Sequence, residues 1–290
     1  MKTDITLNQI EKKKTKTKTI VAASHKSSGK TTFLLNLADY LLQLGFSILY
    51  VDLDPIRAAD DFYVQRQEMK DKAIQTLTDL ITINTDNENF KNIPHLNQKI
   101  KNLTMSAKLK VYGSAIASFN IDNVQNTHTE FDFILVDIPA NIYTSTDEIK
   151  PEFLEILKKS DLAIFPFKAD AQELKTAPYI GRVVKELKAG MESKGKSLDT
   201  IIRSLISFES SKYKGAKGIS RIEETLTDFH FAYGETHPPI LAPMVYRAIY
   251  PNMLAQAKSI FSSNSADSDI AKAEFKAIAD QIFAELNINN

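Results

Sequence analysis

The sequence predicts an α/β protein with a doubly wound, mostly parallel β-sheet and helices on both faces. Strand-like apolar runs alternate with stretches of helical spacing along most of the chain, and this alternation is typical of a parallel sheet. No linker long enough to divide the chain interrupts the pattern. We therefore expect a single domain over residues 19–290, preceded by a polar, basic leader over residues 1–18.

The expected elements follow from apolar periodicity. Strands are predicted at 19–23, 47–52, 108–112, 132–137, 161–166, 200–206 and 240–245. Helices are predicted near 30–44, 68–82, 146–159, 171–189, 218–229, 250–261 and 268–286. Asp267 or Ser268 can cap the last helix, and Phe275, Ile278, Ile282 and Leu286 line one of its faces. Residues 83–106 are rich in Asn, Asp and Lys and indicate a surface excursion.

Composition narrows the class of protein. The chain has 290 residues, of which 43% are hydrophobic and 25% charged, as is ordinary for a globular protein. Its 36 basic and 36 acidic side chains balance, so any contact with nucleic acid must come from a local patch. Without cysteine there is no disulfide, thiolate zinc site or iron–sulfur cluster. No apolar run approaches the roughly 20 residues of a membrane span, so we expect a cytoplasmic protein.

The most informative segment is residues 24–32, Ser-His-Lys-Ser-Ser-Gly-Lys-Thr-Thr. It connects a predicted buried strand to a helix whose leucines recur at helical spacing, which is the context that a phosphate-binding P-loop requires. The loop's backbone N–H groups and the helix N-terminus favour an anion. Lys30 would reach the β- and γ-phosphates of a nucleotide, and the Thr31 hydroxyl would ligate Mg²⁺.

Two further strands end in aspartates. Residues 46–51 lead into Asp52-Leu53-Asp54-Pro55, and residues 131–136 lead into Asp137-Ile138-Pro139. Carboxylates at the carboxyl ends of parallel strands lie where such sheets bind ligands. An Asp at the tip of an apolar strand downstream of a P-loop has the form of a Walker B element. Each Asp alone could merely end a strand, but together, behind Gly-Lys-Thr, they favour a nucleotide site.

With these motifs the chain resembles the ParA/MinD family of deviant Walker A ATPases. The resemblance rests on residues 24–32, 51–55 and 131–139, and extends more loosely from about residue 18 to 286. It implies a P-loop NTPase fold in which Mg-ATP holds two protomers face to face and hydrolysis releases the dimer. Members of the family position plasmids, chromosomes, septa or other cargo.

The resemblance also implies roles for individual residues. Lys30 neutralises the phosphates, and Thr31 with Asp137 holds Mg²⁺. Asp54 orients or activates the attacking water, and Asp52 supports the metal shell or the P-loop. The nucleotide-binding residues are then His25, Ser27, Ser28, Gly29, Lys30, Thr31, Thr32 and Asp52.

The loop departs from the family pattern at its start. The family's first lysine, which crosses the dimer interface, is replaced here by His25, with Lys26 one place later and Ser27 in place of a glycine. A neutral imidazole cannot replace a fixed ammonium. Either Lys26 serves as a catalytic residue from a shifted position, or nearby phosphates charge His25, or activation across the interface is lost. We favour Lys26.

Adenine recognition is also open: Arg203 stands where the family often has Asn, and residues 243–247 could pack on the base.

The resemblance further implies an ATP-dependent homodimer, a ParB-like or other adaptor that stimulates hydrolysis, and non-specific, salt-sensitive DNA binding near the nucleoid. A solvated loop would explain the basic run at residues 212–217 equally simply. The candidate DNA contacts are Lys212, Lys214, Lys217, Arg221, Arg247 and Lys258.

Three alternatives stay open. A MinD-like protein would end in a basic amphipathic helix, but the polar face of residues 276–286 is mixed or acidic, so we do not expect membrane binding. A dethiobiotin-synthetase-like enzyme would share the fold, although Asp52-Leu53-Asp54-Pro55 favours the positioning ATPases. The altered loop also suits a nucleotide-binding module with little hydrolysis.

Overall fold

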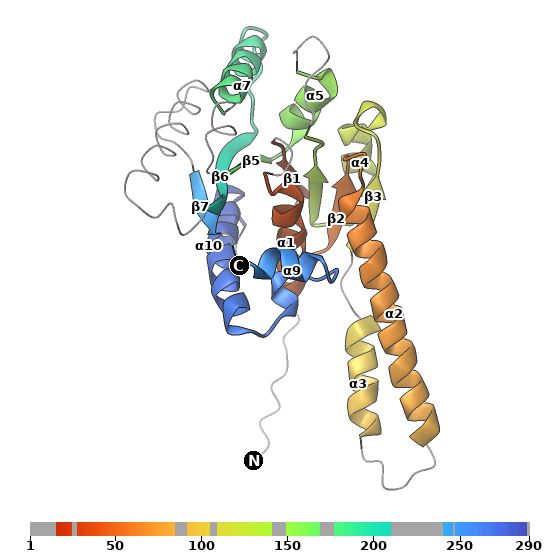
Figure 1. Cartoon of the computed structure of the whole chain (residues 1–290). Coiled ribbons are helices and arrows are strands. Elements are labelled where there is room, and N and C mark those ends of the chain that lie inside the picture. The colour runs from red at the N-terminus through yellow and green to blue at the C-terminus, as the bar shows by residue number, and fades with distance from the viewer. Residues whose placement is uncertain are drawn as a thin grey trace, which may run out of the picture.

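Seven parallel strands form one sheet in the order β3-β2-β4-β1-β5-β6-β7 (Figure 1). The computed structural model describes residues 16–24, 28–84, 92–104, 109–140, 149–168, 177–209, 240–245 and 247–288. The strands are β1 (Lys18–Ala22), β2 (Ile48–Asp52), β3 (Leu109–Gly113), β4 (Phe133–Asp137), β5 (Leu162–Lys168), β6 (Ile201–Glu209) and β7 (Ile240–Val245). The predicted fold class and all seven predicted strands are confirmed.

Helices cover both faces of this sheet. The α-helices are α1 (Lys30–Gln43), α2 (Ala58–Asn84), α3 (Ile93–Thr104), α4 (Ile121–Thr127), α5 (Pro151–Lys159), α7 (Ala177–Glu192), α9 (Ile249–Leu254) and α10 (Ala266–Glu285). Two short 3₁₀ helices, η1 (Ile116–Ser118) and η3 (Ile260–Ser262), complete the described elements. None of the described helices is both long and apolar enough to cross a membrane.

The alternation of side chains along the strands divides the core in two. One apolar cluster joins the sheet to α1, the start of α2, α9 and α10, and the other joins it to α4, α5 and α7. Successive residues of a strand point to opposite faces, so Ile20 belongs to the first cluster and Val21 to the second. Strands covered on both faces need apolar residues at nearly every position, which explains the continuous apolar runs.

The predicted C-terminal helix packs on the sheet as α10. Phe275, Ile278, Ile282 and Leu286 are all buried, as the periodicity predicts. The cap is different: the Ser265 side chain accepts a hydrogen bond from the Ser268 backbone N–H at 3.2 Å, so neither Asp267 nor Ser268 is the N-cap.

Several helix boundaries differ from the predictions. α2 begins ten residues earlier than expected, because Ala59, Phe62 and Tyr63 are buried against the core. α5 begins later, at Pro151, where the fixed φ of proline suits a first turn. The expected helix at 250–261 divides into α9 and η3, with Ala257 between them at a φ of 48°. α4 was not predicted, and the helix predicted at 218–229 lies outside the described residues.

The segment predicted as a surface excursion contains α3. Figure 1 shows α2 and α3 side by side, extending away from the sheet as a helical hairpin. Leu96 is buried in this hairpin, whereas Leu80 and Ile83 of α2 are exposed. The near end of α2 is attached more firmly, because Arg66 Nη1 donates to both carboxylate oxygens of the buried Asp39 on α1, at 2.6 and 2.7 Å.

Candidate nucleotide site

The ends of three neighbouring strands bring the sequence motifs together. Across the sheet Asp137 is in register with Ala22 at the end of β1 and with Asp52 at the end of β2. β1 therefore ends beside Asp137, with Asp52 one strand further along the same edge of the sheet. This is the carboxyl edge of the parallel sheet, where open α/β folds bind their ligands.

The start of α1 is built around Gly29. Its φ of 90° is left-handed, a conformation that glycine adopts without steric cost, and its carbonyl accepts from the Phe33 N–H at 2.8 Å. This turn places Lys30 and Thr31 in the first turn of the helix. The Lys30 amine donates to the Ser24 carbonyl at 3.0 Å, and the Lys30 residue is only 6% exposed.

Thr31 and Asp137 meet directly. The Thr31 hydroxyl donates to Asp137 Oδ2 at 2.6 Å, although the residues are 106 positions apart. The Tyr50 hydroxyl donates to the same oxygen at 3.2 Å. The two residues predicted to share a magnesium ion are thus neighbours in space, with a tyrosine that sequence reasoning missed. Tyr50 lies two residues before Asp52 on β2, so strand periodicity could have placed it on the same face.

The environment of Asp137 favours its protonated form while no cation is bound. Burial raises the pKa of the Asp137 carboxyl to about 7, and Asp52 adds to the rise. The Thr31 hydrogen bond, the Lys30 charge and the Tyr50 hydrogen bond act in the opposite direction. A carboxyl in this position is poised to lose its proton when a divalent cation arrives.

Three of the six buried side-chain polar atoms that have no hydrogen-bond partner among the described residues belong to the P-loop segment or to Asp137. Ser24 Oγ, Ser28 Oγ and Asp137 Oδ1 are buried and have no hydrogen-bond partner among the described residues. Each such atom costs about 1–3 kcal/mol, so a cluster of them is expected where a ligand completes the bonding. Together with the Lys30 amine and the Thr31 hydroxyl, this donor set fits a magnesium–phosphate group, whose preferred protein ligands are carboxylate and hydroxyl oxygens.

Asp52 lies in register with Asp137 on the neighbouring strand, and both of its carboxylate oxygens accept hydrogen bonds from backbone N–H groups. Its Oδ1 accepts from the Asp54 N–H at 3.0 Å, and its Oδ2 accepts from the N–H groups of Ala59 at 3.0 Å and Asp60 at 3.3 Å. Asp52 therefore caps α2 and fixes the loop that carries Asp54. Burial raises the pKa of the Asp52 carboxyl, and these backbone N–H groups partly offset the rise.

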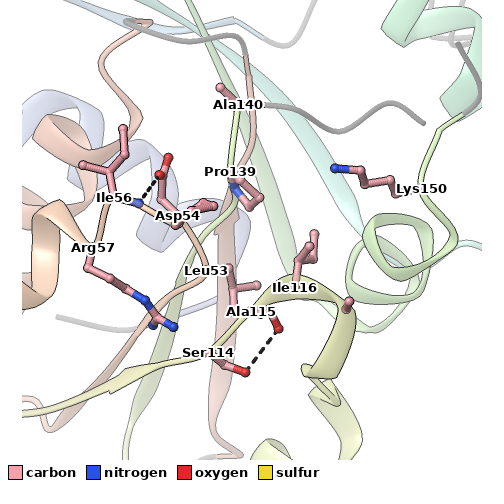
Figure 2. A pocket seen from close by; sticks show the side chains of 12 residues that line it. Leu53, Asp54, Ile56, Arg57, Ser114, Ala115, Ile116, Pro139, Ala140 and Lys150 are labelled. Carbon is pink, nitrogen blue, oxygen red and sulfur yellow. Dashed lines mark hydrogen bonds between the residues drawn. The ribbon is translucent and has the colours of Figure 1, made fainter. Parts of the chain in front are cut away.

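Asp54 is one of the residues that line a pocket of about 490 Å³ (Figure 2). The lining comes from residues 53–57 after β2, residues 114–117 after β3, residues 139–140 after β4, and Lys150 before α5. Figure 2 shows the Asp54 carboxylate and the Arg57 guanidinium pointing away from one another. Asp54 Oδ1 accepts from the Ile56 N–H at 2.9 Å, which closes a tight turn around Pro55.

Other predicted site residues fall in two groups. Some lie outside the described residues, and their roles stay predictions: His25, Lys26, Ser27, Lys212, Lys214, Lys217 and Arg221. The others have described neighbours. Arg247 is paired with Glu274 at 2.5 Å, and Arg203, within β6, is paired with Glu285 at 2.6 Å. Lys258 is exposed and donates to Gln256 at 3.4 Å.

Among the described residues, no group of three or more His, Cys, Asp or Glu side chains could hold a metal ion by itself. A cation at Asp137 would thus need oxygens from outside the carboxylate set, such as the Thr31 hydroxyl, phosphate or water. That requirement is typical of Mg²⁺ in nucleotide sites.

Comparisons with known proteins agree with this geometry. The family AAA_31, described as an AAA domain, matches residues 17–194. No curated protein sequence matches the chain. Solved structures show the fold: an aspartate-to-alanine variant of McdA from Cyanothece in complex with ATP has a TM-score of 0.57 and 16% identity, covering 95% of this chain and 98% of that one.

Two further structures are similar. A putative plasmid partition protein from Borrelia burgdorferi bound to AMPPNP has a TM-score of 0.56 and 16% identity, covering 93% of this chain and 100% of that one. The MinD cell division protein from Aquifex aeolicus has a TM-score of 0.56 and 14% identity, covering 91% and 96%. With the family match over more than half its length and a P-loop that meets an aspartate at the tip of β4, the chain belongs to the ParA/MinD family of P-loop ATPases.

Proposed function

We propose that this protein is an ATPase that dimerises on Mg-ATP, hydrolyses it slowly, and partitions a plasmid or chromosome through non-specific DNA binding. The proposal that the protein binds a nucleotide is supported most directly by the contact between the Thr31 hydroxyl and Asp137 at 2.6 Å, beside the buried Lys30 amine. That contact joins the P-loop to the Walker B strand, and a metal-bound triphosphate needs both.

Each of the predicted site residues would have its own role in nucleotide binding and hydrolysis. Thr31 and Asp137 would hold Mg²⁺, which neutralises phosphate charge when bound, and Lys30 would exchange its contact with the Ser24 carbonyl for phosphate oxygens. Asp54, which lines the pocket, would orient the attacking water. Hydrolysis of this kind depends on positioning and charge stabilisation rather than on covalent chemistry.

The proposed cellular role draws on the shared fold and on the charges of the described surface residues. Solved structures named for plasmid partition and for McdA share the fold, at 16% identity. Lys258 is exposed, whereas Arg247 is neutralised by Glu274, so we expect Arg247 to contribute less to DNA affinity. The proposal also includes DNA contacts by the basic run at residues 212–217 and a location at the nucleoid. It further includes an ATP-dependent homodimer and an adaptor that stimulates hydrolysis.

The test is DNA binding and oligomeric state with ATP, ADP or no nucleotide, using random-sequence duplex DNA at 50 and 200 mM salt. We expect binding and dimerisation only with ATP, and a loss of affinity of about a thousandfold or more at the higher salt if six or more phosphates are contacted. K30A is the matched control, which should neither dimerise nor bind. DNA binding that ignores nucleotide would refute the proposal.

Two other results would replace the proposal. ATP-dependent binding to anionic liposomes, with no DNA binding, would indicate a MinD-like role. Tight ATP binding without phosphate release, in the presence or absence of DNA, would indicate a nucleotide-binding module, as the altered loop at His25 and Lys26 allows.

A further inference from the structure

Arg57 has an unusual backbone conformation for its residue type. Its φ is 56°, in the left-handed region that is unfavourable for a non-glycine residue. It ends the turn that starts at Asp54, because the Arg57 N–H donates to the Asp54 carbonyl at 3.0 Å. The Asp61 N–H in turn donates to the Arg57 carbonyl at 3.0 Å, which joins the turn to α2. A strained residue beside a functional loop needs a compensating contact.

The guanidinium supplies that contact. Arg57 Nη1 donates to the carbonyl of Asp52 at 2.8 Å, and the same carbonyl accepts from the Ser114 N–H at 3.1 Å. Three segments therefore meet at one oxygen: the end of β2, the start of α2 and the residue after β3. Arg57 links the two ends of the loop that contains Asp54, and Figure 2 shows its side chain reaching from the start of α2 back toward Ser114.

Gly113 makes room for this link. A Cβ on Gly113 would lie 2.0 Å from Arg57 Nη1 and 2.9 Å from Arg57 Cζ. The three nearest atoms that such a Cβ would meet all belong to the end of the flexible Arg57 side chain. An alanine at position 113 would thus displace the guanidinium while it leaves the backbone of β3 little disturbed.

We propose that Arg57 is a positioning residue for hydrolysis: together with Gly113 it locks the loop between Asp52 and Arg57 so that Asp54 is presented at a fixed place beside the triphosphate site. This inference rests on the proposed function, in which Asp54 orients the attacking water. Arg57 acts through Asp54 and not on the nucleotide itself, because its guanidinium is directed to the Asp52 carbonyl, away from the Asp54 carboxylate.

The test compares three variants. R57G keeps a residue that tolerates positive φ and removes the guanidinium, which separates the lost link from backbone strain. G113A keeps Arg57 and displaces its guanidinium. G190A is the matched control, since a Cβ on Gly190 in α7 would meet nothing within 4 Å.

Two measurements are made on each variant. Amide hydrogen exchange of Leu53, Asp54, Ile56 and Ser114, without nucleotide, should be at least tenfold faster in R57G and G113A and unchanged in G190A. The kcat for ATP hydrolysis should fall about 10- to 100-fold in the same two variants, with the dissociation constant for ATP within twofold of the original. R57K should recover part of both effects.

The double variant R57G/G113A should be no worse than either single variant, because both changes remove one link. Unchanged hydrogen exchange in R57G and G113A, or effects on kcat that multiply in the double variant, would overturn the inference. If the unaltered protein binds ATP but does not hydrolyse it, the proposed function fails, while hydrogen exchange still decides whether Arg57 locks the loop.

Discussion

Replacing Asp137 by Asn should stabilise the nucleotide-free protein at alkaline pH while it abolishes the response to Mg-ATP. Burial raises the pKa of the Asp137 carboxyl from an ordinary 3.8 to about 7. A rise of about three units is worth roughly 4 kcal/mol, at 1.36 kcal/mol per unit, against the ionised form in the folded state. The asparagine carries no charge and avoids this cost.

The direction in which stability changes with pH follows from proton binding. Between pH 3.8 and about 7 the folded protein holds a proton on Asp137 that the unfolded chain has lost, so stability falls as the pH rises through this window. D137N should lack that fall. Its amide would place an N–H group near the unpaired Oδ1 position, at a cost of about 1–3 kcal/mol. We therefore expect a net gain of roughly 1–3 kcal/mol at pH 8, and little or no gain at pH 5.

The assay is urea unfolding in EDTA at pH 5, 6, 7 and 8, with D79N as the control because Asp79 is an exposed carboxyl on α2. The difference between D137N and the original protein should widen by roughly 2–3 kcal/mol from pH 5 to pH 8. Adding Mg-ATP at 100 times its dissociation constant should then stabilise the original protein by about 2.7 kcal/mol and D137N far less. A difference that stays constant with pH would refute the assignment of the raised pKa to Asp137.

Three further changes test the site and the core. K30A should lose measurable heat of ATP binding in calorimetry, because the buried amine beside the Ser24 carbonyl would be gone; binding that persists within threefold would contradict its role. D52A should release the start of α2, so that the amides of Ala59 and Asp60 exchange faster while those of α10 do not. F275A should lower the free energy of unfolding by about 3–5 kcal/mol in urea titration, because the ring is fully buried; a loss below 1 kcal/mol would show that the surroundings collapse to fill the space.

Strand periodicity and motif order were sufficient to predict where the site lies. Continuous apolar runs identify doubly covered strands, and parallel strands bring their carboxyl ends to one edge. The meeting of Thr31 with Asp137, 106 residues apart, follows from that rule without any pairwise information. The fold and the contact between Thr31 and Asp137 were therefore predictable from local patterns.

The parts that could not be predicted depend on tertiary contacts. The first ten residues of α2 carry charges at Asp60 and Asp61 and show little helical periodicity, but a cap from Asp52 and burial of Phe62 and Tyr63 extend the helix to Ala58. The link between Arg57 and Gly113 joins elements more than fifty positions apart, so no local pattern indicates it. Acidic residues in a first helical turn are a start signal, and that signal could have corrected the boundary.

The two aspartates of the β2 end have separate physical tasks. Asp52 is buried and bonded to backbone N–H groups on both oxygens, and these bonds partly offset the cost of burying its charge. Asp54 is only partly buried and lines the pocket. A carboxylate that orients water must keep an oxygen available and must also be held still. In the proposed function, Asp52 and Arg57 would hold the loop in place, and Asp54 would keep an oxygen available for the water. We therefore expect the two residues to differ in their effects: loss of the Asp52 side chain would loosen the loop, and loss of the Asp54 side chain would slow hydrolysis.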